Sequence, residues 1–347
     1  MQPNTNIAEK INTSNTIPMR FNEYDFLENI IRSNVSNFDE LALNLFLFQY
    51  ANNAIYAHFV KNIGLKKDEI TAAEIPFLPV EFFKTQSIRT TDFKPEIIFT
   101  SSGTTGLISG KHEVKDISIY RRSFSKTFEL FYGNISEYCL LALLPSYLER
   151  EGSSLVFMTE ELIKRSAHPD SGFYLHDLKK LAVTLDKLKK NKQKTILLGV
   201  TFALLDFAEQ YPVEFPELII METGGMKGRR KEIVREEVHS ILKKSFSVQN
   251  IHSEYGMTEL LSQAYSKGEG KFKCPPWMKV VITDPNDPMK KISAGKTGVI
   301  NVIDLANIYS CAFIKTADLG RINPDETFEV IGRLDNTDLR GCNLMYL

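Results

Sequence analysis

The sequence is poor in the residues from which disulfide frameworks and metal centres are built. Its 347 residues include only four cysteines and six histidines. The cysteines, Cys139, Cys274, Cys311 and Cys342, are scattered and show no C-x-x-C spacing. This distribution argues against a disulfide framework or a structural zinc site, and it suits a reducing cytosol. The histidines are also isolated, with no H-E-x-x-H or comparable cluster, so we expect packing or surface roles for them.

Long apolar runs and an excess of charge of one sign are missing as well. No segment approaches the roughly 20 apolar residues that a helix needs to span a bilayer. Residues 1–18 lack the apolar core of a secretory signal, so a cytoplasmic protein is expected. The net charge of −1 offers no electrostatic reason for the chain to bind nucleic acid or an anionic membrane. The lysine-rich stretches 179–194 and 227–244 are interrupted by acidic and apolar residues at helical spacing, which indicates solvated helix faces.

What is present is an ordinary globular composition, with 43% hydrophobic and 24% charged residues. The pattern along the chain predicts three parts. An N-terminal helical region covers 1–95, a nucleotide-binding body covers 96–274, and a smaller β-rich subdomain with the C-terminal tail covers 275–347. Helices are expected in the first part at 22–34 and 38–62.

In the body, short apolar runs alternate with amphipathic helical segments. This alternation predicts right-handed crossovers and an α/β fold with a large, mostly parallel sheet flanked by helices. Such sheets bind ligands outside the carboxyl ends of their strands. The expected strands lie at 97–100, 138–144, 195–200, 218–223 and 248–252, and the expected helices near 116–131, 154–165, 177–191, 201–210 and 229–244.

A segment rich in serine, threonine and glycine directly follows the expected strand at 97–100. Glycines let backbone N–H groups approach an anion closely, and hydroxyl groups add donors, so this loop is a candidate phosphate-binding site. It is not a Walker A loop, which needs G-x-x-x-x-G-K-[ST]. Its expected position between a strand and a helix favours a binding role over an ordinary surface loop. The segment TSSGTTG comprises Thr100, Ser101, Ser102, Gly103, Thr104, Thr105 and Gly106.

Four further segments follow in a recognisable order. They are ETGGMKG at 222–228, HSEYGMTEL at 252–260, TADLGRI at 316–322 and IGRLDNTDLRG at 331–341. Together with TSSGTTG, they resemble the motifs of the adenylate-forming superfamily, which includes acyl-CoA synthetases, firefly luciferase and the adenylation domains of peptide synthetases. The resemblance spans about residues 97–342, and it implies the N-terminal-domain fold of that superfamily.

The resemblance implies ATP and Mg²⁺ as cofactors and assigns a role to each motif. TSSGTTG would close over the ATP phosphates, and the Gly224–Gly225 pair would let adenine approach the backbone. In the Y-G-x-T-E segment, which contains Gly256, Tyr255 would stack on adenine. Two catalytic residues come from the same segment, with the Thr258 hydroxyl on the α-phosphate and Glu259 as the metal ligand.

Two later motifs complete the nucleotide site that the resemblance implies. Asp318 would hold the ribose hydroxyls, and Arg333 would contact ribose or phosphate. The sequence departs from the family pattern at two places. Ala317 replaces the usual glycine before the aspartate, and the family's Pro-Lys after the phosphate loop is absent, with Lys111 the nearest lysine.

The C-terminal end favours one branch of the superfamily. Acyl-CoA synthetases continue past the G-R-x-D segment into a further domain with a catalytic lysine, and this domain is expected to be absent here. The short ending resembles the LuxE-type acyl-protein synthetases of bacterial bioluminescence complexes. That resemblance implies an acyl-accepting cysteine near the C-terminus, which is Cys342 here. Arg340 would favour its thiolate, the nucleophilic form.

The sequence therefore predicts ATP-dependent activation of a carboxylic acid, expected to be a fatty acid, and transfer of the acyl group to a protein thiol. An acyl reductase or an acyl-carrier protein would be a fitting partner. Two alternatives stay open at this point. One is an acyl- or aryl-CoA ligase with CoA as the acceptor, and the other is a non-catalytic nucleotide-binding subunit of a larger complex. Acid-dependent exchange of labelled pyrophosphate into ATP separates the enzymes from the binding protein.

Overall fold

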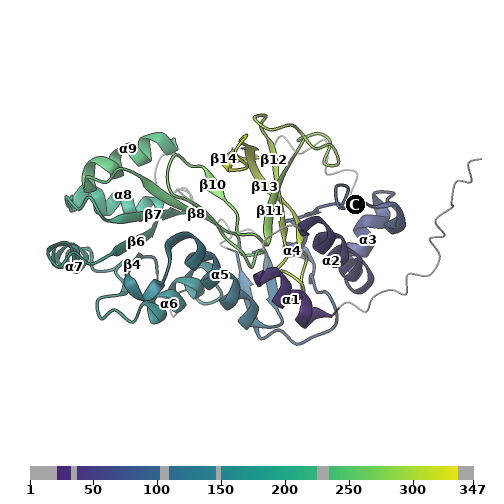
Figure 1. The fold of residues 1–347 in the computed structure, drawn as a ribbon, viewed down its shortest axis with the longest axis horizontal. Coiled ribbons are helices and arrows are strands. Elements are labelled where there is room, and N and C mark those ends of the chain that lie inside the picture. The colour runs from purple at the N-terminus through teal and green to yellow at the C-terminus, as the bar shows by residue number, and fades with distance from the viewer. Residues whose placement is uncertain (1–21, 33–36, 102–108, 146–149, 225–233, 335–347) are drawn as a thin grey trace, which may run out of the picture.

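The computed structural model describes residues 22–32, 37–101, 109–145, 150–224 and 234–334. Among these residues, twelve strands join in one hydrogen-bonded sheet. Its strand order is β11-β12-β13-β14-β10-β9-β8-β7-β6-β4-β5, with β1 paired to β13 (Figure 1). The strands of one half pair in parallel and those of the other half pair antiparallel, except that β1 joins β13 in parallel.

The parallel half confirms the predicted α/β body. Its strands are β4 (Cys139–Leu143), β5 (Gly172–Phe173), β6 (Thr195–Val200), β7 (Ile219–Thr223) and β8 (Ile251–Tyr255). All residues of β4 and β6 are buried, as expected for parallel strands covered on both faces.

Helices α8 and α9 cover one face of this half, and α5 and α6 cover the other (Figure 1). The helices of the body are α5 (Ile117–Tyr132), α6 (Ser154–Ser166), α7 (Leu178–Lys190), α8 (Thr201–Gln210) and α9 (Arg235–Phe246), with a 3₁₀ turn at Ile135–Glu137. Within the described ranges, no helix is both long enough and apolar enough to cross a membrane.

The antiparallel half continues the same sheet, because β9 pairs antiparallel with β8. The strands after 275 are therefore hydrogen-bonded to the body, and the predicted domain boundary at 274/275 stays a prediction. This half consists of β9 (Ala264–Ser266), β10 (Phe272–Lys273), β11 (Met278–Thr283), β12 (Gly298–Asp304), β13 (Phe313–Ile322) and β14 (Phe328–Arg333).

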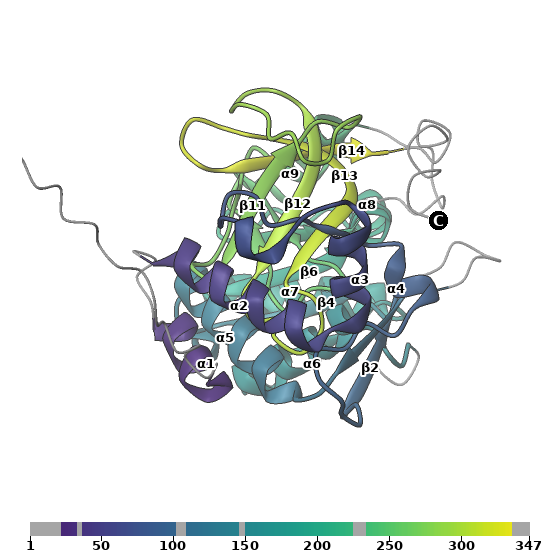
Figure 2. The ribbon, with the colours of Figure 1, turned by 90° about the vertical axis from the view of Figure 1, so that its right-hand side faces the viewer.

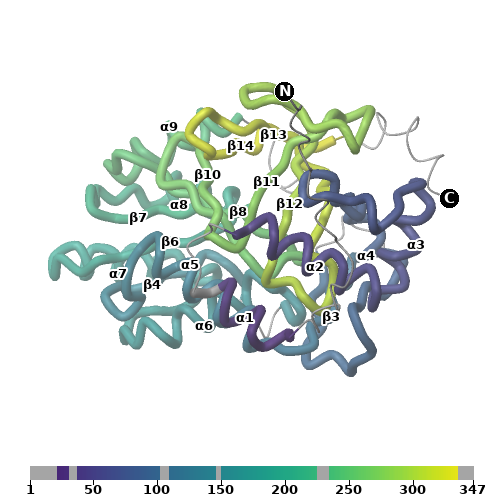
Figure 3. The backbone as a smooth tube through the Cα atoms, turned by 45° about the vertical axis from the view of Figure 1, so that its right-hand side comes forward, coloured from purple at the N-terminus to yellow at the C-terminus, as the bar shows by residue number. Residues whose placement is uncertain are grey.

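The N-terminal helices pack against both halves. Helix α1 (Glu23–Arg32) lies beside α5 (Figure 3). Helix α2 (Phe38–Asn52) crosses in front of the antiparallel strands (Figure 2), and the Gln49 amide donates to the Ile308 carbonyl at 2.9 Å. The remaining short elements are the 3₁₀ turn Lys67–Glu69, β1 (Leu78–Pro79) and α4 (Phe82–Thr85).

The single helix expected at 38–62 is in fact two helices, α2 and α3 (Ala54–Asn62). Asn53 between them has an extended backbone, and its side chain accepts a hydrogen bond from the Tyr56 N–H at 3.0 Å. This is the arrangement of an N-cap, so Asn53 ends one helix and begins the next.

The strand expected at 97–100 was wrongly placed in the parallel sheet. Strand β2 (Ile97–Thr100) pairs antiparallel with β3 (Lys111–Val114) in a separate two-stranded sheet. Thr100 lies opposite Lys111, so TSSGTTG begins at the end of a hairpin strand and not between a parallel strand and a helix. The physical reason is exposure: Ile98 is 42% exposed, whereas strands of a covered parallel sheet are buried on both faces.

Candidate functional site

Three sequence-predicted residues from separate motifs meet in one hydrogen-bonded chain. Tyr255 is the last residue of β8, while Asp318 and Arg333 are register partners on β13 and β14. The Tyr255 hydroxyl donates to Asp318 Oδ2 at 2.9 Å. The Arg333 Nε–H donates to Asp318 Oδ1 at 3.1 Å. Tyr255 and Arg333 lie 63 and 15 residues from Asp318 in the sequence, and the fold brings both side chains to its carboxylate.

This hydrogen-bonded chain has a buried end at Tyr255 and an exposed end at Arg333. Burial raises the pKa of Tyr255 well above its usual value, so its hydroxyl stays protonated and donates. Its ring packs edge-on against Phe272 and Phe328, with centroids 5.9 and 5.5 Å away. The Arg333 side chain is 79% exposed, so its remaining N–H groups face solvent. Stacking of Tyr255 on adenine stays a prediction.

The turn that carries Thr258 and Glu259 follows β8, and its backbone is held by side chains from distant segments. His112 Nδ1 donates to the Thr258 carbonyl at 2.8 Å. The Asn307 amide donates to the Glu259 carbonyl at 2.8 Å. Because these bonds fix the backbone, the turn has a defined conformation without help from a ligand.

A fully buried carboxylate anchors the continuation of this turn. Asp304 Oδ2 accepts from the Leu261 N–H at 2.7 Å, and its Oδ1 accepts from the Ser262 hydroxyl at 2.6 Å. Burial raises the pKa of Asp304 to about 6, even though these hydrogen bonds favour the charged form. Sequence reasoning missed His112, Asn307 and Asp304, since no motif or spacing marks them.

The Glu259 carboxylate is buried against the β2–β3 hairpin. A Cβ atom added to Gly110 would lie only 2.8 Å from Glu259 Oε1, so the hairpin backbone closely approaches the carboxylate. The Gly110 N–H in turn donates to the Ser101 hydroxyl at 2.8 Å. Burial raises the pKa of Glu259 to about 7, and the charges of Lys84 and Arg333 act in the opposite direction. No ion pair joins Glu259 to another residue of the described ranges.

The other predicted nucleotide-site residues fall into two groups. Among the described ones, the Thr100 N–H donates to the Gly152 carbonyl at 2.7 Å, and the Thr201 hydroxyl donates to the Gly224 carbonyl at 2.8 Å. Gly224 has a φ of +69°, which favours glycine. Outside the described residues lie Ser102, Gly103, Thr104, Thr105, Gly106, Gly225 and Cys342.

Strand β8 runs from Ile251 to Tyr255, later than its predicted position at 248–252, and it carries several polar residues. Ser253 donates to Glu222 at 3.0 Å on one face of the sheet, and Thr223 donates to Glu254 on the other. These buried bonds let polar residues occupy a central strand. Burial raises the pKa of Glu254 to about 7. Gly256 leaves room for this carboxyl, because a Cβ there would lie 2.5 Å from Glu254 Oε1.

The second buried carboxylate, Glu222, has a different environment. Burial acts to raise its pKa, but the hydrogen bond and charge of His239, together with Arg235, lower it overall. The His239 Nε2 atom lies 2.9 Å from Glu222 Oε1. Glu222 is therefore paired, whereas Glu254 has a hydrogen bond from Thr223 alone among the interactions that shift its pKa.

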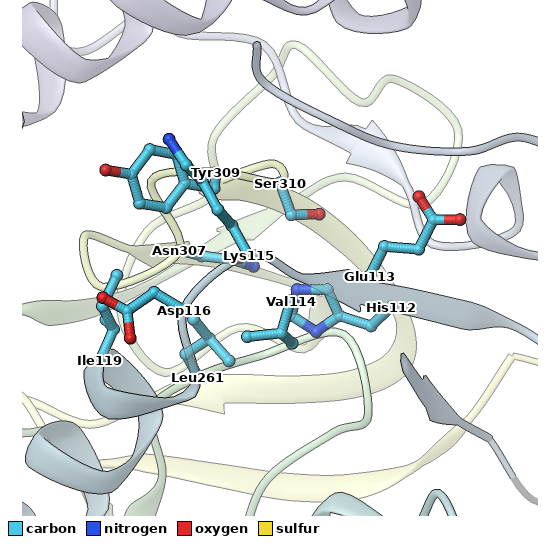
Figure 4. A pocket seen from close by; sticks show the side chains of 10 residues that line it. All are labelled: His112, Glu113, Val114, Lys115, Asp116, Ile119, Leu261, Asn307, Tyr309 and Ser310. Atoms are coloured by element: carbon cyan, nitrogen blue, oxygen red, sulfur yellow. The ribbon is translucent and has the colours of Figure 1, made fainter. Parts of the chain in front are cut away.

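Neither of two hollows in the described part of the chain is lined by Tyr255, Glu259 or Asp318. The first is about 10 Å³, room for one water molecule, and the side chains of His112 and Asn307 line it (Figure 4). The second, about 450 Å³, lies along α9 and is lined by Arg235, Glu236, His239, Ser240, Lys243 and Glu269.

Comparison with known proteins finds similarity over most of the chain. The family described as "Acyl-protein synthetase, LuxE" matches residues 25–346. A Vibrio harveyi protein, long-chain-fatty-acid–luciferin-component ligase, is 24% identical over 325 residues, which cover 88% of this chain and 85% of that protein.

Two solved structures confirm the adenylate-forming fold. A 2-hydroxyisobutyryl-CoA ligase in complex with 2-HIB-AMP and CoA gives a TM-score of 0.66 at 14% identity, covering 86% of this chain and 68% of that one. ATP-bound MatB from Rhodopseudomonas palustris gives a TM-score of 0.53 at 18% identity, and the match covers 70% of this chain. The chain spans 50% of the length of MatB.

Proposed function

The chain belongs to the acyl-protein synthetase (LuxE) family, and we propose that its acid is a long-chain fatty acid. As a member of this family, it is a ligase that activates an acid with ATP as an acyl-adenylate and passes the acyl group to protein. The name of the Vibrio harveyi relative supports this acid class. The CoA ligases are similar in fold alone, so CoA as acceptor is the weaker alternative.

One observation carries the assignment of the nucleotide site. Tyr255, Asp318 and Arg333 form one hydrogen-bonded chain, and the Arg333 charge acts on the Glu259 carboxylate in the adjacent turn. In the proposed arrangement, Asp318 holds the ribose hydroxyls and Arg333 contacts ribose or phosphate. The Thr258 hydroxyl steadies the charge that develops at the α-phosphate. Adenylation needs positioning and charge neutralisation more than proton transfer, because the acid is already ionised at neutral pH.

The Glu259 carboxylate fits a magnesium ligand. It is 6% exposed, and burial raises its pKa to about 7, so the charged form lacks a full counter-charge. A hard divalent cation prefers carboxylate and phosphate oxygens and would supply that charge. When bound, Mg²⁺ neutralises the ATP phosphates and favours departure of pyrophosphate. Glu259 would hold the ion beside the β2–β3 hairpin, in which TSSGTTG begins at Thr100.

The proposed acceptor is Cys342. The three other cysteines are poor nucleophiles, because burial raises the pKa of Cys139 to about 11 and of Cys274 and Cys311 to about 12. Thiols with such values are almost entirely protonated at neutral pH, and the thiolate is the attacking form. An acyl reductase or acyl-carrier protein would then take the group from the thioester.

Acid-dependent exchange of labelled pyrophosphate into ATP tests the first half-reaction. We expect exchange with long-chain fatty acids, dependence on Mg²⁺, and undiminished exchange in Cys342→Ser. Exchange supported only by short or aryl acids would overturn the acid class. Absence of exchange with every acid would favour the non-catalytic nucleotide-binding subunit. Acyl-CoA formation on addition of CoA, without acylated protein in its absence, would favour the CoA ligase.

A further inference from the structure

The β2–β3 hairpin and the Thr258–Glu259 turn touch at two points on one face of the hairpin. Gly110 lies just before β3 and His112 lies two residues later, so both face the same side of the strand. Gly110 approaches the Glu259 carboxylate, with its added Cβ 2.8 Å from Oε1. His112 reaches the Thr258 backbone, with its Nδ1 atom 2.8 Å from the carbonyl oxygen.

The His112 side chain is buried and has two polar neighbours: the Thr258 carbonyl, and the Asn307 side chain, whose hydrogen bond favours the charged imidazole. It is 1% exposed, and the Phe83 ring meets it edge-on with centroids 5.9 Å apart. A carbonyl oxygen only accepts, so the Nδ1 atom must carry the hydrogen. Burial lowers the pKa of His112 to about 4, which keeps the imidazole neutral near pH 7. A fixed neutral tautomer is what a positioning contact requires, whereas a proton carrier requires a group that titrates near the working pH.

The register of the hairpin places this contact close to the phosphate loop. His112 pairs with Phe99, and Lys111 pairs with Thr100, the first residue of TSSGTTG. Asn307 holds the neighbouring carbonyl of Glu259 at 2.8 Å and lines the same water-sized cavity as His112 (Figure 4). His112 therefore links the hairpin directly to the turn, beside the start of the proposed phosphate loop.

We propose that His112 is a positioning residue that joins the phosphate-binding hairpin to the metal-binding turn, so that ATP phosphates and Mg²⁺ are bound as one unit. This inference rests on the proposed function, because it takes Thr100 and Ser101, the described start of TSSGTTG, as part of the phosphate site and Glu259 as the metal ligand. Removing the Nδ1 donor leaves the partly buried Thr258 carbonyl without its partner and loosens the turn. We expect roughly a 10-fold rise in both the KM for ATP and the Mg²⁺ concentration for half-maximal exchange.

The test compares three variants in the full chain. His112→Leu removes the donor at similar volume, and His112→Asn places an amide nitrogen where Nδ1 lies. Val114→Ala is the matched packing control, because Val114 is 3% exposed, lines the same cavity as His112 and has an apolar side chain that makes no polar contact with the turn. Pyrophosphate exchange gives kcat, the KM for ATP and the Mg²⁺ dependence, and Tm reports folding.

We expect His112→Leu to raise KM and the Mg²⁺ requirement with a smaller change in kcat, and His112→Asn to restore both within roughly threefold. Val114→Ala should lower Tm and leave both constants unchanged. If His112→Leu lowers Tm alone, or if Val114→Ala raises KM equally, His112 is a packing residue and the inference fails. His112→Gln, whose amide lies one bond further out, replaces His112→Leu if that variant does not fold.

A failure of the proposed function would look different. Wild-type protein would then show no exchange with any acid. In that case, calorimetry would measure how ATP binding depends on Mg²⁺ in wild type and in His112→Leu. Equal Mg²⁺ dependence of binding in the two proteins would overturn the role of His112. A weaker dependence in the variant would support it, even with the catalytic reading rejected.

Discussion

The close approach of Gly110 to Glu259 makes a single methyl group a sensitive probe of the proposed metal site. In Gly110→Ala, the new Cβ would lie 2.8 Å from Glu259 Oε1, 3.3 Å from Ser101 Oγ and 3.8 Å from Phe83 Cβ. The φ of Gly110 is not in the left-handed region, so alanine fits the backbone. The carboxylate oxygen is too close and must move, the Ser101 hydroxyl must give way slightly, and the Phe83 contact is an ordinary one.

The required movement sets the expected size of the effect. A relaxed carbon–oxygen contact needs roughly 3.3 Å, so Oε1 must shift by about 0.5 Å. Mg²⁺ demands near-ideal octahedral geometry at about 2.0–2.1 Å and tolerates such a shift poorly. Changes beside metal ligands typically cost 10- to 100-fold in affinity. The free energy of unfolding should change little, because Glu259 is a flexible side chain and alanine restricts the unfolded chain by about 0.4–1 kcal/mol.

The assay is pyrophosphate exchange at saturating ATP and acid over a Mg²⁺ series. Gly110→Ala should need at least roughly 10-fold more Mg²⁺ for half-maximal exchange, with recovery at high Mg²⁺ and a Tm within about 2 °C of wild type. Gly172→Ala is the matched control, because its Cβ meets only Tyr174 Cε2 at 3.8 Å. An unchanged Mg²⁺ dependence in Gly110→Ala would refute Glu259 as the metal ligand.

Two further substitutions probe the carboxylates of the site. Asp318→Asn removes the charge that accepts from Tyr255 and Arg333, so the KM for ATP should rise about 10- to 100-fold with kcat less affected; equal KM values would contradict its ribose role. Glu254→Gln should change how stability depends on pH. The folded pKa of about 7 exceeds the ordinary 4.5, so the wild type loses stability as pH rises from about 4.5 to above 7. Measured by urea unfolding, the free energy of unfolding of the variant relative to wild type should rise by up to about 3 kcal/mol between about pH 5 and about pH 8. Parallel pH curves for the two proteins would count against this assignment.

Much of the body follows from simple sequence patterns. Runs such as CLLAL at 139–143 and TILLGV at 195–200 are wholly buried, and each is followed by an amphipathic helix. Continuous apolar runs between helical segments are typical of covered parallel strands. The motif order also nominated Tyr255, Asp318 and Arg333, and the sheet brings them together, because Tyr255 and Arg333 end β8 and β14 and Asp318 pairs with Arg333. Their roles in nucleotide binding stay predictions.

Other features depend on contacts that sequence patterns do not encode. The β2–β3 hairpin was misplaced, because three apolar residues followed by a loop of serine, threonine and glycine suit either kind of sheet. The bond between His112 and Thr258 joins residues 146 positions apart, and an isolated histidine has no pattern that marks it. Glu254 also escaped prediction, since its burial depends on Thr223 from a neighbouring strand and on the space that Gly256 leaves.

Acyl transfer to the chain's own thiol is tested most directly by the intact mass of the chain after incubation with ATP, Mg²⁺ and a long-chain fatty acid, without CoA. We expect a mass gain of one acyl group that hydroxylamine removes and that disappears in Cys342→Ser, while that variant still exchanges pyrophosphate. A wild-type chain that exchanges pyrophosphate but never gains the acyl mass would contradict transfer to its own thiol. An acyl mass that persists in Cys342→Ser would contradict Cys342 as the acceptor.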